Sequence, residues 1–132
     1  MNSNMAADDA AVAGAKCILV VEDEPLIRLV ISDELREHGF EVVEACNADE
    51  AMVILASTTP DLILTDVQMP GSIDGADLLA LVKASTPGVP VIIASGTWEP
   101  TVQQMEIASR IVPKPFSIDA LVKAIQEELE IS

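Results

Sequence analysis

Aromatic residues are nearly absent from this chain of 132 residues, which contains two phenylalanines, one tryptophan and no tyrosine. The core must therefore be built from aliphatic side chains, and half of all residues are hydrophobic. Basic residues are also scarce, because the chain has seven lysines and arginines but 22 acidic residues, a formal net charge of −15. This balance argues against nucleic-acid binding, which requires clustered positive charge along the phosphate backbone.

Cysteines and long apolar runs are equally limited. Cys17 and Cys46 lie in no Cys-x-x-Cys pair and beside no histidine, which argues against zinc, and we expect both thiols to be buried. The longest apolar runs, such as residues 89–94, are far shorter than the roughly 20 residues of a membrane helix. The amino-terminal segment lacks the basic residues of a secretory signal, so we expect a cytoplasmic chain.

The length suits one domain, in which short apolar runs alternate with segments of helical periodicity. Residues 1–14 show no periodicity and are predicted to form a flexible tail, with the folded domain at residues 15–132. Strands are predicted at residues 17–21, 40–45, 62–65, 89–94 and 111–112. Helices are predicted at residues 25–38, 47–57, 74–84, 101–109 and 118–129.

Local signals mark the ends of two predicted helices. Pro25 suits a first helical turn, and His38 with Gly39 is typical of a carboxyl-terminal cap. Asn47 followed by Glu50 is typical of a capping box. The apolar positions of the first helix follow helical spacing, and they are Leu26, Ile27, Val30, Ile31 and Leu35. We expect this apolar face to pack on the sheet.

Strands that alternate with helices predict an α/β fold in which a parallel sheet is covered on both faces. Right-handed crossovers leave few topologies, and the leading one is the flavodoxin-like (βα)5 sandwich with strand order 2-1-3-4-5. In that order the first and third strands are neighbours, and ligands bind at the carboxyl ends of the strands. Glu22 and Asp23, which follow the first strand, would then meet Asp66 at the end of the third.

Three carboxylates in one crevice repel one another unless a cation lies between them. Mg²⁺ suits such a site, because it binds a few carboxylates together with water and phosphate oxygens. An aspartate beside this metal can act as a nucleophile and form an aspartyl phosphate. Ser95 and Lys114 end the fourth and fifth predicted strands, and they would supply a hydroxyl and a cation to phosphoryl oxygens.

Over about residues 16–130 the chain resembles the receiver domains of two-component response regulators. The resemblance rests on five motifs in the expected order, which are Val21-Glu22-Asp23-Glu24-Pro25, Asp66-Val67-Gln68-Met69-Pro70-Gly71, Asp74-Gly75, Ser95-Gly96 and Lys114-Pro115-Phe116. Each motif alone is weak. Together, each at the end of a predicted strand, they are a specific signal.

The resemblance implies a role for each site residue. Asp66 would be the phosphoacceptor, Asp23 a direct ligand of Mg²⁺, and Glu22 a ligand that acts through water. The backbone carbonyl of Gln68 would complete the protein ligands of the metal.

The resemblance also covers the two residues on the later strands. Ser95 is similar to the switch hydroxyl of the family, and Lys114 to the ion-pair partner of the phosphoryl group. Gln68 and Thr97 occupy the variable positions that tune autodephosphorylation. The sequence departs from the family at Ile111, where an aromatic switch residue is common, so an aromatic route from the site to the surface is not expected.

We therefore predict a stand-alone receiver that takes a phosphoryl group from a histidine kinase or histidine-phosphotransfer protein onto Asp66 with Mg²⁺. Its output would be a protein contact or onward phosphoryl transfer. We expect a phosphoacceptor and not an enzyme, present as a monomer or weak dimer. We expect no nucleic-acid or membrane partner. Two alternatives stay open. A metal-dependent phosphatase with an aspartyl nucleophile would need an Asp-x-Asp pair, which Gln68 breaks. A non-phosphorylated adaptor is disfavoured because every residue of the phosphoacceptor site is present.

Overall fold

Five parallel strands form the centre of this computed structural model. The structure describes residues 15–66, 80, 82–84, 88–95, 110–113 and 117–129, with the backbone alone described at residues 95, 111 and 113. The strands are β2 (Cys17–Val21), β3 (Glu41–Ala45), β4 (Leu62–Asp66), β5 (Val91–Ser95) and β6 (Arg110–Pro113). Their order in the sheet is β3-β2-β4-β5-β6, which confirms the predicted order 2-1-3-4-5.

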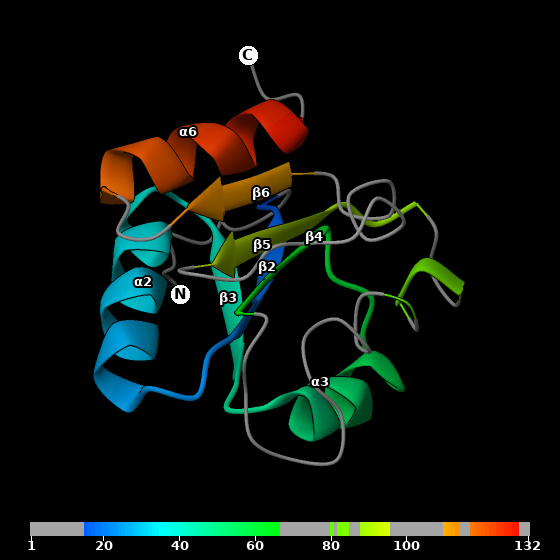
Figure 1. Cartoon of the computed structure of the whole chain (residues 1–132). Coiled ribbons are helices and arrows are strands. Elements are labelled where there is room, and N and C mark those ends of the chain that lie inside the picture. Colours follow the sequence, from blue (N-terminus) through cyan, green and yellow to red (C-terminus); the bar gives the residue numbers. More distant parts are fainter. Residues whose placement is uncertain are drawn as a thin grey trace, which may run out of the picture.

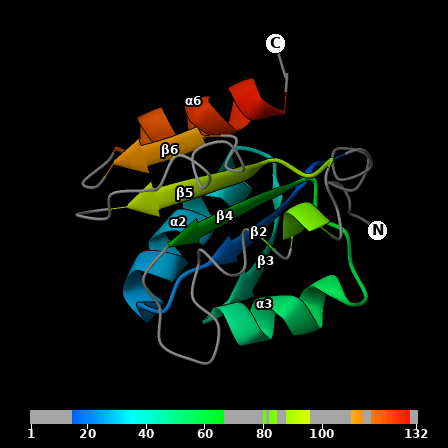
Figure 2. The same cartoon turned by 45° about the vertical axis from the view of Figure 1, so that its right-hand side comes forward.

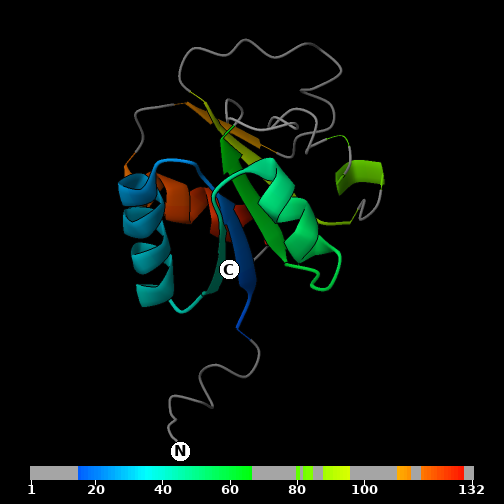
Figure 3. The ribbon, with the colours of Figure 1, turned by 90° about the horizontal axis from the view of Figure 1, so that it is seen from below.

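Helices cover both faces of this sheet. The helices with described bounds are α2 (Pro25–Glu37), α3 (Ala48–Leu55) and α6 (Ile118–Glu128). Helices α2 and α6 lie on one face of the sheet, and α3 lies on the other (Figures 1, 2 and 3). Residues 80 and 82–84 are helical, as predicted. The rest of the helix predicted at 74–84, the helix predicted at 101–109 and the tail predicted at 1–14 lie outside the described residues. No helix in the described parts of the chain is long and apolar enough to cross a membrane.

The two faces of the sheet have separate cores. Ile18 and Val20 of β2 pack in the cluster that contains residues of α2 and α6, whereas Leu19 and Val21 pack in the cluster that contains residues of α3. Successive side chains of a strand point to opposite faces, so both sets are buried. Burial on both faces explains why the strand is a continuous apolar run without polar alternation.

The apolar face predicted for α2 is wrong in part. Ile31 and Leu35 are buried, as expected, but Leu26, Ile27 and Val30 are 76%, 43% and 54% exposed. With 3.6 residues per turn, Leu26 and Val30 lie on the side of the helix away from the stripe formed by Ile31 and Leu35. Helix α2 therefore carries a second apolar surface that does not contribute to the core.

The predicted helix ends are confirmed, with one difference. The N–H of Glu50 donates to Asn47 Oδ1 at 2.7 Å, as in a capping box. The carboxylate of Glu50 accepts from the N–H of Cys46 at 2.7 Å, one residue before the N-cap. His38 is the C-cap of α2, and Gly39 follows with φ +93°, a conformation that favours glycine.

The two cysteines are free and only partly buried, so the prediction of buried thiols is wrong. Cys17 begins β2, where its N–H donates to Asp61 Oδ2 at 2.7 Å and its carbonyl accepts from the N–H of Asp61 at 2.8 Å. Partial burial raises the pKa of the Cys17 thiol, and the carboxylates of Glu41 and Asp61 raise it further. Cys17 therefore favours its protonated, less reactive form.

Ser32 is a polar residue in the apolar interface of α2. Its side chain is fully buried, and its hydroxyl has no hydrogen-bond partner among the described residues. A buried hydroxyl without a partner costs about 1–3 kcal/mol, and alanine is the better helix former. We expect Ser32→Ala to raise the free energy of unfolding by about 1 kcal/mol and the melting temperature by roughly 4 °C.

Ser117→Ala is the matched control, because the same substitution should have the opposite sign there. Ser117 Oγ caps α6 by accepting from the N–H of Ala120 at 3.0 Å, and loss of such a cap costs about 1 kcal/mol. Thermal unfolding followed by circular dichroism measures both changes. A melting temperature lowered by Ser32→Ala would mean that the hydroxyl is satisfied in the native protein.

Candidate functional site

Three acidic side chains converge at the carboxyl edge of the sheet. Val21, the last residue of β2, is the register partner of Thr65 on β4, so Glu22, which follows Val21, and Asp66, which follows Thr65, lie at the same level of the sheet. One carboxylate oxygen each from Glu22, Asp23 and Asp66 lies within 4.8 Å of the other two. Glu22 is buried, and the other two residues are partly exposed. The structure thus brings together the three acids that the strand order predicts to be neighbours.

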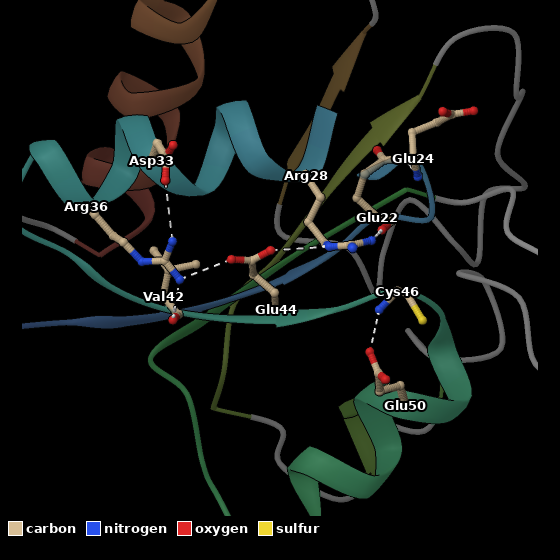
Figure 4. A network of polar contacts seen from close by, with 9 residues as sticks. All are labelled: Glu22, Glu24, Arg28, Asp33, Arg36, Val42, Glu44, Cys46 and Glu50. Carbon is tan, nitrogen blue, oxygen red and sulfur yellow. Dashed lines mark hydrogen bonds and ion pairs between the residues drawn. The ribbon is translucent and has the colours of Figure 1, made fainter. Parts of the chain in front are cut away.

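Glu22 is held by three hydrogen bonds of different kinds. Its N–H donates to the carbonyl of Ala45 on β3 at 3.0 Å. Its carboxylate accepts from the N–H of Glu24 at 3.0 Å, and its carbonyl accepts from Arg28 Nη1 at 2.7 Å. The side chains of Glu22, Glu24 and Arg28 are drawn in Figure 4. A buried carboxylate needs such partners, and here they also determine the course of the loop after β2.

Asp66 ends β4, the central strand of the sheet. Residues 62–65 before it are buried, and Asp66 itself is partly exposed. Its register partner on β5 is Ala94, and the hydroxyl of Thr65 donates to the carbonyl of Asp66 at 2.8 Å. The strand therefore anchors the backbone of Asp66 and leaves part of its side chain in contact with solvent.

The remaining predicted site residues are described in part or not at all. Ser95 is the last residue of β5, so its backbone lies at the same edge of the sheet as the acids. Its register partner is Pro113, the residue directly before Lys114. The side chain of Ser95, all of Lys114 and Gln68, and the side chain of Ile111 lie outside the described residues. The roles assigned to these residues stay predictions.

The ligand atoms of this pocket suit a hard cation. Among the described residues, Glu22, Asp23 and Asp66 form the one group of acidic, histidine or cysteine side chains close enough to share a metal, and all their ligand atoms are oxygens. Ligand oxygens around an octahedral Mg²⁺ lie about 3 to 4 Å apart, and the three carboxylate oxygens here all lie within 4.8 Å of one another. The three side chains therefore fit Mg²⁺ better than zinc, which prefers nitrogen and sulfur.

Two residues that the sequence did not predict are connected to this pocket: Arg28, which contacts the loop after β2, and Glu44, which contacts Arg28. Arg28 Nε donates to Glu44 Oε1 at 3.2 Å, in addition to the bond from Nη1 to the carbonyl of Glu22. The available signal was the place of Arg28 within an apolar segment, residues 26–31, because a charge in such a segment needs a partner. The sequence could not identify the partner, since Glu44 lies on a different element.

Comparison with known proteins gives the same assignment. Residues 18–126 match the family described as the response regulator receiver domain. The nitrogen assimilation regulatory protein NtrX of Azorhizobium caulinodans is 36% identical over 117 residues, which are 86% of this chain and 26% of that protein. The transcriptional regulatory protein PdtaR of Mycobacterium tuberculosis is 34% identical over 121 residues, which are 89% of this chain and 58% of that protein. The chain thus spans about a quarter of NtrX and somewhat over half of PdtaR.

Solved structures agree with the sequence comparison. The receiver domain of NtrX from Brucella abortus has a TM-score of 0.80 and 34% identity, covering 87% of this chain and 99% of that one. The response regulator TrrA from Thermotoga maritima, solved in complex with Mg²⁺-BeF, has a TM-score of 0.78 and 30% identity, covering 86% and 98%. The family match, residues 18–126, includes the three acids of the pocket. The chain therefore belongs to the response regulator receiver domains of two-component signal transduction.

Proposed function

We propose that Asp66 is the phosphoacceptor of this receiver domain and that it reacts with Mg²⁺ in the acidic pocket. The observation that carries the proposal is the convergence of Glu22, Asp23 and Asp66 within 4.8 Å at the carboxyl edge of the sheet. The structure of TrrA with Mg²⁺-BeF supports the choice of metal. The three carboxylates, with the backbone carbonyl of Gln68, would hold the ion. When bound, it would offset the negative charge of the phosphoryl oxygens.

The proposed reaction transfers a phosphoryl group from a histidine of a kinase or phosphotransfer protein. A carboxylate oxygen of Asp66 attacks phosphorus, a P–O bond forms as the P–N bond breaks, and the leaving imidazole takes up a proton from solvent. Ser95 and Lys114 would donate to the phosphoryl oxygens from the ends of β5 and β6. The domain is thereby a phosphoacceptor whose altered charge at the sheet edge carries the signal.

Acetyl phosphate tests this proposal without a protein partner. We expect the wild-type chain to gain one phosphoryl group by intact mass when it is incubated with acetyl phosphate and Mg²⁺. Chelation of the metal with EDTA should prevent the gain in mass, because without the cation the carboxylates repel the incoming phosphate. A wild-type chain that gains no mass under these conditions would contradict the proposal.

Removal of one carboxylate should weaken metal binding. Asp23→Asn keeps the size of the side chain but removes a charge from the pocket, so we expect the Kd for Mg²⁺ to rise at least about tenfold. Isothermal titration calorimetry measures this change. Asp119→Asn is the control, because Asp119 is an exposed residue of α6 and the change in net charge is the same. Equal affinity in Asp23→Asn and the wild type would exclude Asp23 as a ligand.

The exposed apolar surface of α2 supports a protein as the phosphodonor. Leu26, Ile27, Leu29 and Val30 are 76%, 43%, 49% and 54% exposed, and their helix begins two residues after Asp23. A protein that brings a phosphohistidine to Asp66 must cover the surroundings of the pocket, and exposed apolar patches are typical of protein contacts. We propose that the phosphodonor packs on these four residues.

A substitution in this surface should affect phosphoryl transfer from a protein but not phosphoryl transfer from a small molecule. We expect Leu26→Ser to slow transfer about tenfold from a phosphorylated histidine kinase that phosphorylates the wild-type chain, because an apolar anchor is lost. Uptake from acetyl phosphate should not change. Val53→Ser is the control, since Val53 is 72% exposed on α3, across the sheet. If both variants react with the kinase at the wild-type rate, the phosphodonor does not use this surface.

The output of the phosphorylated domain is proposed to be a protein contact or onward phosphoryl transfer in the cytoplasm. The flexible tail at residues 1–14, the stand-alone organisation and the monomer or weak dimer stay predictions. NtrX and PdtaR are both longer than the part that this chain matches.

A further inference from the structure

Arg28 connects the loop after β2, which carries Glu22 and Asp23, to Glu44 on β3. It lies in the first turn of α2, and its guanidinium donates in two directions: Nη1 to the carbonyl of Glu22 at 2.7 Å and Nε to Glu44 Oε1 at 3.2 Å. Its side chain is only 20% exposed. Figure 4 shows the guanidinium between these two partners. Arg28 is thus a shielded cation with defined orientation, unlike an ordinary surface arginine.

The carbonyl that Arg28 contacts belongs to the peptide unit that joins Glu22 to Asp23. A peptide unit is planar, so fixing the direction of this carbonyl also fixes the N–H of Asp23 and the direction in which the chain continues. Glu22 is already anchored on its other side by the bond from its N–H to the carbonyl of Ala45. Without Arg28, rotation of this peptide unit would move Asp23 relative to Asp66.

Glu44 holds Arg28 in this orientation. Its second oxygen, Oε2, accepts from Arg36 Nη2 at 3.1 Å, and Arg36 Nη1 lies 3.6 Å from Asp33 Oδ1. The two arginines and two acids have no net charge together. A positive charge beside the pocket repels a metal cation, so Arg28 cannot favour metal binding through its charge, and any favourable effect must be on geometry.

We infer that Arg28, held by Glu44, is a positioning residue that aligns the two acids of the Glu22–Asp23 loop for metal binding. The inference rests on the proposed Mg²⁺ site. It predicts that lysine cannot replace Arg28, because a single ammonium group lacks the fork that reaches a carbonyl and a carboxylate at once.

Calorimetric titration with Mg²⁺ tests the inference. We expect Arg28→Met to bind Mg²⁺ about tenfold more weakly than the wild type, as for other residues that orient metal ligands. Arg110→Met is the matched control. Arg110 also makes two ion pairs, with Glu127 at 2.7 Å and Glu128 at 3.1 Å, but it lies on β6 at the other edge of the sheet. Its hydrogen bond to Glu127 raises the pKa of Arg110, so it is fully charged, and its replacement should leave the affinity for Mg²⁺ unchanged.

Hydrogen exchange gives a readout that does not require the metal. In the absence of Mg²⁺, we expect the amides of Asp23 and Glu24 to exchange faster in Arg28→Met, because the loop is released, and to be unchanged in Arg110→Met. A general loss of stability would affect the two variants alike.

Each result has a distinct meaning. If the wild-type chain does not bind Mg²⁺, the proposed function fails. If the wild type binds the metal and Arg28→Met binds it equally well, only the present inference fails. Arg28→Lys is the second variant, and it carries the test alone if circular dichroism shows that Arg28→Met does not fold. Wild-type affinity in Arg28→Lys would mean that the two-directional contact of the guanidinium is not needed to align the acids, which also overturns the inference.

Discussion

Asp66→Asn should abolish phosphoryl uptake completely, whereas the wild-type chain gains one phosphoryl group from acetyl phosphate with Mg²⁺. The amide of asparagine is a poor nucleophile, and the replacement of Asp66 also removes one of the three negative charges of the pocket. Intact-mass spectrometry after a fixed incubation measures the loss directly. We expect this to be the largest effect on function. Among the three acids of the pocket, Asp66 is the one that lies at the end of the central strand.

Asp61→Asn is the control at the opposite end of β4. Asp61 accepts from the N–H of Cys17 there, and asparagine keeps an oxygen that can accept the same bond. This variant should take up the phosphoryl group as the wild type does. A phosphoryl group that persists in Asp66→Asn, and that peptide mapping places on another residue, would remove Asp66 as the acceptor.

Ile63→Ala should have the largest effect on stability. Ile63 has no exposed surface, and it lies in β4 with register partners on both sides, Leu19 on β2 and Val91 on β5. Shortening it leaves a cavity that the two neighbouring strands cannot close, which typically costs about 2–5 kcal/mol. Urea unfolding should show a lower midpoint with the same slope.

Val53→Ala removes apolar atoms from an exposed position. Val53 is 72% exposed in α3, so we expect the free energy of unfolding to change by less than about 0.5 kcal/mol. Similar losses in Ile63→Ala and Val53→Ala would contradict the packing of β4 between its two neighbours.

Much of the fold could be predicted from the sequence because its signals are local. The run before Asp66 is apolar at every position, which is typical of a strand that is buried on both faces, and β4 is such a strand. Asn47 and Glu50 mark the start of α3 through bonds within four residues. The order of the strands followed from the right-handed crossover rule, which leaves few ways to arrange five parallel strands.

The errors arose where a residue depends on distant parts of the chain. Helical spacing correctly identified α2, but it could not show that Leu26 and Val30 lie away from the sheet, since the whole segment is apolar. Cys17 begins an apolar run and was therefore expected to be buried, yet it lies at the amino end of β2 and is partly exposed. Position along a strand decides such exposure, and hydrophobicity does not.

The sequence by itself determined the parallel α/β architecture, the family motifs and the positions of Glu22, Asp23 and Asp66 at the ends of strands. These features depend on local periodicity and on a chirality that all proteins share. Only the tertiary structure decided that the three carboxylates lie within 4.8 Å of one another, and that Arg28 contacts both Glu44 and the loop that carries the acids. Those contacts join different elements, so they depend on how β2, α2, β3 and β4 pack against one another and not on the order of residues in any one of them.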